Sequence, residues 1–277
     1  MRLALLGYPL AHSLSPAMHN AALAAVGLSD WRYDARPVEP ERIGEAVAML
    51  RGEDYAGANV TVPHKEAVIR FLDGLTPAAE AIGAVNTIFK KDGRLIGHNT
   101  DAAGLLADLH MHGVSISRSL VLLLGAGGAA RAAVAVCAGV GAKVRVIARR
   151  REQAESLQTL ITDNCSLGIF DWTPLGFLQA GGNCALIINC TPIGMSPNAE
   201  ASPWLDGTPF PPDAFVYDMI YNPADTRLTQ QARAQGLRAA TGLGMLVEQG
   251  ALAFELWTGK TAPRSLMREA AETKLYS

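Results

Sequence analysis

Short runs of apolar residues alternate with amphipathic stretches along the whole chain. The runs have the length of buried strands, and the stretches between them repeat apolar residues with a helical period. This alternation favours an α/β fold with parallel sheets over an all-α or all-β fold. The expected strands cover residues 2–7, 31–37, 56–60, 85–89, 95–97, 119–124, 144–148, 185–189 and 214–218. The expected helices cover residues 15–26, 39–50, 64–72, 76–82, 102–110, 131–138, 152–160, 225–235, 245–257 and 263–274.

Local signals mark where several of these elements begin and end. Ser15 before Pro16 predicts a helix start with the serine as N-cap and the proline in the first turn. Lys91-Asp92-Gly93 predicts a hairpin turn between two short strands. The proline-rich residues 196–212 are expected to form a long surface loop.

Composition narrows the class of protein. With 277 residues, 49% hydrophobic and 18% charged, the chain has the material for packed cores and is not a disordered chain. The net charge of −2 comes without a basic block of the kind that binds nucleic acid. The longest apolar runs fall short of the roughly 20 residues of a membrane span, and the start of the chain breaks too early for a signal peptide. Four cysteines without metal-type spacing indicate reduced thiols in a cytoplasmic enzyme.

A glycine-rich turn follows the strongest strand signal. Gly125-x-Gly127-x-x-Ala130 lies between the strand at 119–124 and an apolar helix, where a dinucleotide-binding turn must lie. The first glycine permits the tight turn, the second admits the pyrophosphate, and the helix N-terminus supplies N–H donors. The alternative is a glycine-rich turn in a fold that binds no nucleotide.

The end of the next strand selects the cofactor. An acidic residue there would bind the ribose of NAD, but the chain reads Ala148-Arg149-Arg150-Arg151, with no acid before Glu152. Guanidinium groups suit a 2′-phosphate, so this pattern predicts NADP. A solvated basic helix start is the alternative.

Polar side chains also follow the strands of the first hundred residues. Ser13 and Ser15 lie in a turn before a helix, where they form either a cradle for a carboxylate or a simple helix cap. Lys65 and Asp101 follow strand ends, where they form either a proton-exchanging pair in a cleft or a surface ion pair. No metal site is expected, because His12, His19 and His64 lack a ligand spacing.

Eight stretches, in this order, match motifs of one enzyme family. They are Gly7-x-Pro9 with His12-Ser13-Leu14-Ser15-Pro16 and His19-Asn20; Asn59-Val60-Thr61-Val62-Pro63-His64-Lys65; Gly83-Ala84-Val85-Asn86-Thr87; Gly97-x-Asn99-Thr100-Asp101; Gly125-Ala126-Gly127-Gly128-Ala129; Asn189-Cys190-Thr191-Pro192-x-Gly194-Met195; Asp218-Met219-Ile220-Tyr221-Asn222-Pro223; and Gly242-Leu243-Gly244-Met245-Leu246-Val247-x-Gln249. Through them the chain resembles the shikimate dehydrogenases over nearly its whole length.

The resemblance implies NADP-dependent reduction of 3-dehydroshikimate to shikimate, on the pathway to chorismate and the aromatic amino acids. It implies Lys65 and Asp101 as the catalytic pair. For the substrate it implies Ser13, Ser15, Thr61, Asn86, Tyr221 and Gln249. For the cofactor it implies Gly125, Ala126, Gly127, Gly128, Ala129, Arg149, Arg150, Thr191, Met219 and Gly242. In the family the stretch at Ala148-Arg149-Arg150 often reads Asn-Arg-Thr, a difference that alters the side chains near the adenosine but keeps the positive charge.

The resemblance also implies a domain organisation. Residues 1–101 with 242–277 would form an N-terminal α/β substrate domain that is discontinuous, and residues 102–241 a Rossmann-type doubly wound domain for NADP. The expected partners are the small-molecule substrate and cofactor, without nucleic acid or membrane, in a monomer or homodimer. The alternatives are a paralogue acting on quinate or aminoshikimate, a methylene-tetrahydrofolate dehydrogenase of similar layout, and a non-catalytic NADP(H)-sensing protein.

Overall fold

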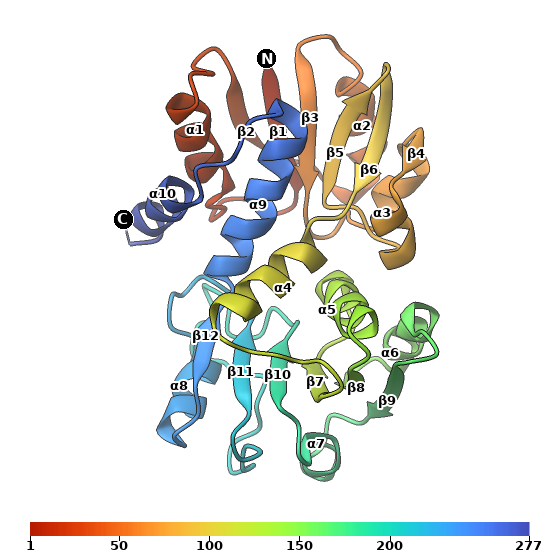
Figure 1. Ribbon diagram of the computed structural model, residues 1–277, viewed down its shortest axis with the longest axis vertical. Coiled ribbons are helices and arrows are strands. Elements are labelled where there is room, and N and C mark those ends of the chain that lie inside the picture. Colours follow the sequence, from red (N-terminus) through yellow and green to blue (C-terminus); the bar gives the residue numbers. More distant parts are fainter. Residues whose placement is uncertain (277) are drawn as a thin grey trace. The chain divides into compact units, whose positions relative to one another are not determined.

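A computed structural model describes residues 1–276 of the chain. The chain divides into two compact units, one formed by Met1–Gly104 with Leu246–Ser277 and the other by Leu105–Met245. Each unit contains one six-stranded sheet (Figure 1). The predicted α/β fold with two domains is confirmed.

The sheet of the first unit is mixed, with the strand order β2-β1-β3-β5-β6-β4. Its first three strands in this order are parallel, and β5 and β6 form the predicted antiparallel hairpin, with Asp92 and Gly93 in its turn. The strands are β1 (Arg2–Gly7), β2 (Arg32–Pro37), β3 (Tyr55–Val60), β4 (Gly74–Leu75), β5 (Thr87–Lys91) and β6 (Arg94–His98).

Helices cover both faces of this sheet, as the alternation of buried residues in β1 requires. Leu3 and Leu5 pack in one core with α1, α9 and α10, while Ala4 and Leu6 pack in a second core with α2, η2 and α3. These helices are α1 (Ser15–Ala25), α2 (Ile43–Met49), the 3₁₀ helix η2 (Ala67–Phe71), α3 (Pro77–Ile82), α9 (Leu243–Thr258) and α10 (Arg264–Leu275).

The sheet of the second unit is parallel throughout, in the order β12-β11-β10-β7-β8-β9. This is the strand order of the doubly wound dinucleotide-binding fold, in which ligands bind beyond the carboxyl ends of the strands. The strands are β7 (Leu120–Leu124), β8 (Lys143–Ile147), β9 (Ser166–Phe170), β10 (Leu186–Asn189), β11 (Phe215–Asp218) and β12 (Ala239–Thr241).

Helices α7 and α8 pack on one face of the second sheet, and α5 contacts β7 and β8. The helices of this unit are α5 (Gly128–Gly139), α6 (Arg151–Ser156), the 3₁₀ helix η3 (Leu157–Leu160), α7 (Pro174–Gly181) and α8 (Arg227–Ala234). The chain passes between the two units within α4 (Asp101–Met111) and within α9.

Two expected helices of the first unit differ from the structure. Residues 39–50 form the 3₁₀ turn η1 (Pro40–Arg42) followed by α2. Residues 64–72 form a turn and the short η2 instead of an α-helix, because tertiary hydrogen bonds take over the backbone and side chain of the turn. The sequence patterns also missed β4, β9, β12 and α7.

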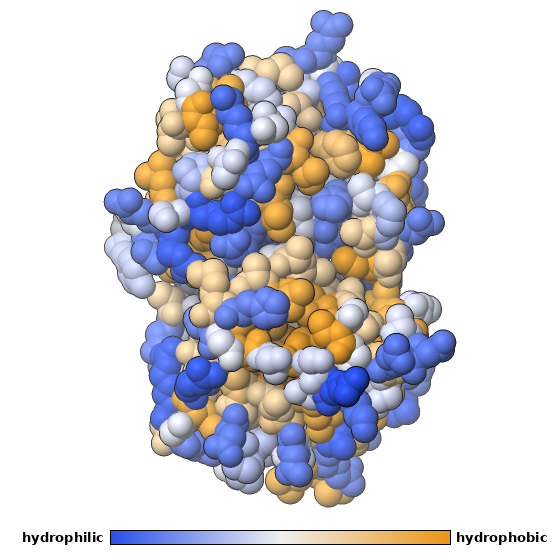
Figure 2. Space-filling model, in the orientation of Figure 1, coloured by the Kyte–Doolittle hydropathy of each residue, from blue (hydrophilic) through white to orange (hydrophobic). Residues whose placement is uncertain are grey.

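The surface mixes polar and apolar residues. Figure 2 shows hydrophilic and hydrophobic side chains interspersed over the face in view. Within residues 1–276, no helix is both long enough and apolar enough to span a bilayer.

Candidate active site

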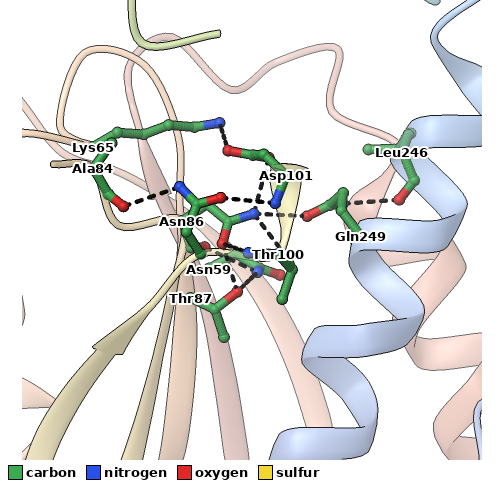
Figure 3. A network of polar contacts seen from close by, with 10 residues as sticks. Asn59, Lys65, Ala84, Asn86, Thr87, Thr100, Asp101, Leu246 and Gln249 are labelled. Atoms are coloured by element: carbon green, nitrogen blue, oxygen red, sulfur yellow. Dashed lines mark hydrogen bonds and ion pairs between the residues drawn. The ribbon is translucent and has the colours of Figure 1, made fainter. Parts of the chain in front are cut away.

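Lys65 and Asp101 form a close ion pair in the first unit. The Lys65 Nζ lies 2.7 Å from the Asp101 Oδ2, and their side chains are 17% and 7% exposed (Figure 3). Surface ion pairs have side chains that water surrounds, so the alternative of a surface ion pair is wrong. The pair is nearly enclosed, with the ammonium its more accessible end.

Asn86, which immediately precedes β5, hydrogen-bonds the Asp101 carboxylate and links it to other polar side chains. Its side-chain nitrogen lies 2.9 Å from the Asp101 Oδ1, 2.8 Å from the Thr100 Oγ1 and 3.2 Å from the Gln249 Oε1. Because this nitrogen has two hydrogens for three acceptors, the bonds are shared among them. Gln249, on α9, also donates to the Leu246 carbonyl oxygen (Figure 3). Catalytic and substrate candidates far apart in the sequence therefore meet in one network.

The turn after β3 that carries Lys65 is fastened on two sides. The ring of His64, buried, lies 2.7 Å from the Val38 carbonyl oxygen, and the Lys65 carbonyl oxygen accepts from the Val85 N–H at 2.7 Å. These bonds hold the backbone at Lys65 while its long side chain reaches toward Asp101.

Asp101 is held at the first turn of α4. Its N–H donates to the Asn99 Oδ1 at 3.0 Å, and the Asn99 amide donates to the Ala84 carbonyl oxygen at 2.9 Å. The N-terminus of a helix favours a negative side chain. The strand end, the cap and the helix together orient the carboxylate toward Lys65.

A buried polar layer below this network was missed by the sequence analysis. The Tyr33 hydroxyl donates to the Asn59 Oδ1 at 2.8 Å, and the Asn59 amide donates to the Asn86 carbonyl oxygen at 3.1 Å and to the Thr87 Oγ1 at 3.2 Å. Asn59 belongs to a motif quoted above, and its polar side chain inside a buried strand was the available signal. Its partners became visible only through strand pairing.

Ser13, in the loop before α1, lies next to Ser15, the first residue of α1, although not as predicted from the cap signal. The N-cap of α1 is Leu14, and Ser15 is already helical, so the expectation that Ser15 caps the helix is wrong. The Ser13 Oγ accepts from the Ser15 N–H at 3.3 Å. Within residues 1–276 the Ser15 hydroxyl has no hydrogen-bond partner. It is therefore available to a ligand.

The two other predicted substrate residues follow strand ends in different units. Thr61 is half-buried after β3, and a Cβ on Gly7 would overlap its methyl group, so the glycine permits this close approach. Tyr221 is half-buried after β11 in the second unit.

The glycine-rich turn of the second unit fits a phosphate-binding turn. Gly125 has a φ of +98°, and a Cβ there would lie 2.7 Å from the Thr191 Cγ2. Gly127 is the N-cap of α5, and a Cβ on it would meet nothing within 4 Å. The N-terminus of α5 therefore faces open space next to a turn that only glycine can make, which suits a pyrophosphate. Gly128 and Ala129, half-buried, form the first turn of this helix.

The arginines after β8 differ in their partners. Arg151 pairs with Glu155 at 3.0 Å within α6. Arg149 and Arg150 are exposed, and in the part of the chain that the structure describes neither guanidinium forms a hydrogen bond or ion pair. These two charges are free to meet a 2′-phosphate. The remaining cofactor candidates, Thr191, Met219 and Gly242, follow the carboxyl ends of strands in the same sheet.

Two of the three histidines considered as ligands, His19 and His64, take structural positions. His19 is fully buried and stacks on Tyr33 with ring centroids 4.3 Å apart, His64 binds a backbone carbonyl, and His12 is exposed. Among residues 1–276 no group of three His, Cys, Asp or Glu side chains is arranged to hold a metal ion.

The chain matches two family models. Residues 5–88 match the one described as the shikimate dehydrogenase substrate binding domain, and residues 242–272 match the shikimate 5′-dehydrogenase C-terminal domain. A shikimate dehydrogenase (NADP(+)) of Symbiobacterium thermophilum is 44% identical over 273 residues, covering 97% of this chain and 92% of that protein.

Solved structures agree. Shikimate 5-dehydrogenase of Thermus thermophilus, in complex with NADP(H) and shikimate, superposes with a TM-score of 0.88 at 39% identity, covering 99% of this chain and all of that one. A 5-ketofructose reductase of a Gluconobacter strain gives a TM-score of 0.85 at 34% identity, covering 99% of this chain and 98% of that one. The predicted resemblance is confirmed, and the chain belongs to the shikimate dehydrogenase family.

Proposed function

We propose that this protein is an NADP-dependent shikimate dehydrogenase, which reversibly reduces 3-dehydroshikimate to shikimate on the pathway to chorismate and the aromatic amino acids. The observation that carries the proposal is the Lys65–Asp101 pair, held by Asn86 in a chain related to named shikimate dehydrogenases over 97% of its length. When bound, NADPH supplies the hydride that reduces the carbonyl carbon.

Lys65 is the proton donor in this proposal. An ammonium group has three hydrogens, and one points to Asp101, which leaves two for a substrate oxygen. In the reduction, Lys65 gives a proton to the carbonyl oxygen as that oxygen becomes a hydroxyl. In the oxidation, the neutral amine takes the proton back. Asp101 orients the lysine and accepts from a neighbouring substrate hydroxyl.

Substrate binding rests on the polar groups around this pair. Ser13 and Ser15 bind the carboxylate, with the unpartnered Ser15 hydroxyl as the main donor. Thr61, Asn86, Tyr221 and Gln249 bind the carboxylate or the ring hydroxyls. Because Asn86 and Gln249 already share a hydrogen bond, a ring hydroxyl that binds one of them also affects the other.

The NADP site lies at the carboxyl ends of the strands of the second sheet. Gly125, Ala126, Gly127, Gly128 and Ala129 cradle the pyrophosphate, and Arg149 and Arg150 meet the 2′-phosphate as planar donors. Thr191, Met219 and Gly242 line the rest of the site. The absence of an acid between Ala148 and Glu152 supports NADP over NAD.

The two domains divide these tasks. Residues 1–101 with 242–277 hold the substrate, and residues 102–241 hold NADP. The two compact units, which separate after Gly104 and after Met245, support this division. We place the enzyme in the cytoplasm as a monomer or homodimer, and the four free cysteines are in keeping with a reducing compartment.

A second candidate is a reductase of neutral keto sugars, which the similarity to 5-ketofructose reductase favours. Such a substrate has no carboxylate, so it would leave the hydroxyls of Ser13 and Ser15 without their anion. We favour shikimate because the loop before α1 keeps the Ser15 hydroxyl available.

The test is the oxidation of shikimate by the purified protein, followed by the near-ultraviolet absorbance of NADPH. We expect turnover with shikimate and NADP⁺, and little with NAD⁺. Quinate with NADP⁺ serves as a competing substrate for the oxidation. In the reverse direction, the reduction of 3-dehydroshikimate is compared with that of 5-ketofructose, both with NADPH. Faster turnover of 5-ketofructose than of 3-dehydroshikimate would replace this proposal with the second candidate, and no turnover of either would refute it.

A further inference from the structure

Asn189 and Asp218 form a sealed polar pair in the second unit. They end the adjacent strands β10 and β11 in register, both are 0% exposed, and the Asn189 amide donates to the Asp218 Oδ1 at 2.8 Å. The other carboxylate oxygen accepts from the Thr226 hydroxyl at 2.7 Å. Buried polar groups cost free energy unless they are hydrogen-bonded, and these two satisfy each other.

On one side, Asn189 holds Thr191. Its Oδ1 accepts from the Thr191 N–H at 2.9 Å and from the Thr191 hydroxyl at 2.7 Å. These two bonds turn the Thr191 methyl toward Gly125, where a Cβ would lie only 2.7 Å away. Asn189 therefore fixes the position of the Thr191 methyl group, against which the phosphate-binding turn packs.

On the other side, the pair holds the turn that contains Met219. The Asp218 Oδ1 accepts from the Ile220 N–H at 3.0 Å, and the Met219 N–H donates to the Asn189 carbonyl oxygen at 3.1 Å. The Gly242 N–H donates to the Ile220 carbonyl oxygen at 3.0 Å, and a Cβ on Gly242 would overlap the Met219 carbonyl group. The segments after β7, β10 and β11 are thus linked through two buried side chains, and the segment after β12 joins them through the backbone bond between Gly242 and Ile220.

We infer that Asn189 and Asp218 are positioning residues for NADP: without touching the cofactor, they hold Thr191, Met219 and Gly242 in the geometry that binds it. This inference rests on the proposed function, since the residues it positions are the proposed cofactor contacts. Burial raises the pKa of Asp218 to about 6, while the hydrogen bonds from Thr226, Ile220 and Asn189 oppose this rise because they favour the carboxylate.

The test compares three variants by calorimetric titration with NADP⁺, by thermal unfolding and by steady-state kinetics. Asn189→Ala removes the bonds to Thr191, and Asp218→Asn keeps the shape but not the charge. Thr226→Val is the matched control, because it removes a bond to the same carboxylate on the side of α8, whose N-cap it is. We expect Asn189→Ala to raise the Kd for NADP⁺ about tenfold or more, because it releases both the N–H and the hydroxyl of Thr191.

If Asn189 and Asp218 position the cofactor contacts, the Kd for NADP⁺ should change while the KM for shikimate and the kcat change little. The KM for shikimate and the kcat at saturating NADP⁺ should stay within about threefold in Asn189→Ala. The shikimate and proton-transfer residues that meet in one network belong to the other unit, and the turn before Tyr221 keeps its bonds to the Asp218 Oδ1 and to the carbonyl oxygen of residue 189. Asp218→Asn, which removes a buried charge and so should fold, should also raise the Kd by about threefold or more. Thr226→Val should lower the Tm while leaving the Kd within about twofold of the unmodified protein.

Two results would overturn the inference: a Kd for NADP⁺ that stays within about twofold in both Asn189→Ala and Asp218→Asn, or one that rises in step with the loss of Tm in all three variants. Either would leave the proposed function intact. An unmodified protein that binds no NADP⁺ would refute the proposed function itself.

Discussion

The buried carboxylates of the two units differ in what faces them. Asp101 meets the Lys65 ammonium and the N-terminus of α4, and the lysine remains partly accessible. Asp218 meets an amide, a hydroxyl and a backbone N–H, all neutral, and is fully buried. A carboxylate paired with an accessible cation can take part in proton transfer with a ligand, whereas a sealed one can only hold its neighbours in place.

The largest effect is expected at Lys65. Lys65→Met keeps the aliphatic stem and removes the ammonium, so we expect kcat to fall by about 10²–10⁴-fold while the Kd for NADP⁺ changes little. Steady-state kinetics and titration measure the two quantities. Lys91→Met, at an exposed position on β5, is the control and should keep kcat. A Lys65→Met enzyme with unmodified turnover would return the lysine to a structural ion pair.

Asp101→Asn tests whether the carboxylate acts through the lysine. It should lower kcat by less than Lys65→Met does, because Asp101 orients the lysine and does not transfer the proton itself. The double variant should lose less than the product of the two single losses, since residues that act as a unit are not additive. Losses that multiply would show that the two residues act independently.

The buried carboxyl group of Asp218 should make the free energy of unfolding depend on pH. Because the folded protein raises the pKa of Asp218 from 3.8 to about 6, the folded state holds this proton more tightly than the unfolded state does. Its contribution to the unfolding free energy is therefore most favourable below about pH 4 and falls by about 3 kcal/mol as the pH rises through about 6.

Thermal or urea unfolding between about pH 4 and pH 7 measures this term. We expect it as a change in the stability difference between the unmodified protein and Asp218→Asn, which lacks the titrating group. The unfolding free energy of the unmodified protein should fall relative to that of Asp218→Asn as the pH rises. A difference that stays constant over this range would mean that the carboxyl group titrates at its ordinary pKa.

Arg149 tests how the second unit selects its cofactor. Arg149→Ala should reduce the preference for NADP⁺ over NAD⁺ by about ten- to a hundredfold, because a charge-assisted bond to the 2′-phosphate contributes about 1.5–3 kcal/mol. The ratio of kcat/KM values for the two cofactors measures the preference. Arg151→Ala is the matched control, since Arg151 is engaged with Glu155. Equal use of both cofactors by the unmodified protein would contradict the assignment.

The smallest effect is expected at the serines. Ser15→Ala and Ser13→Ala should raise the KM for shikimate by about three- to tenfold with little change in kcat, because a carboxylate anchor binds ground and transition states alike. The KM for NADP⁺ serves as the internal control. An unchanged KM for shikimate in both variants would mean that these hydroxyls only shape the loop.

Much of the fold could be predicted from local patterns. The strand at residues 2–7 and the cap of α3, where the Thr76 hydroxyl accepts from the Ala79 N–H and Gly83 turns left-handed, agree with the structure. Edge elements were missed because their patterns are weak: β12 has three residues, and β9 is half-exposed or exposed along its length. The region 64–72 was misassigned because the Lys65 carbonyl oxygen accepts from the N–H of Val85, distant in sequence, where a helix would supply its own donor, and because the His64 ring binds the Val38 carbonyl oxygen.

For the site, the motifs alone predicted the chemistry, because they named Lys65, Asp101, the serines and the glycine-rich turn with its arginines as candidates. The motifs did not predict which of these groups meet or which buried polar side chains hold them, because these contacts depend on how the chain packs. Asn59, Thr100, Asn189 and Asp218 acquire their roles through strand register and loop contacts that bring together residues 14 to 29 or more positions apart. The physical reason is that a buried polar side chain is defined by its hydrogen-bond partners, and those partners are set by the packing of the chain in three dimensions.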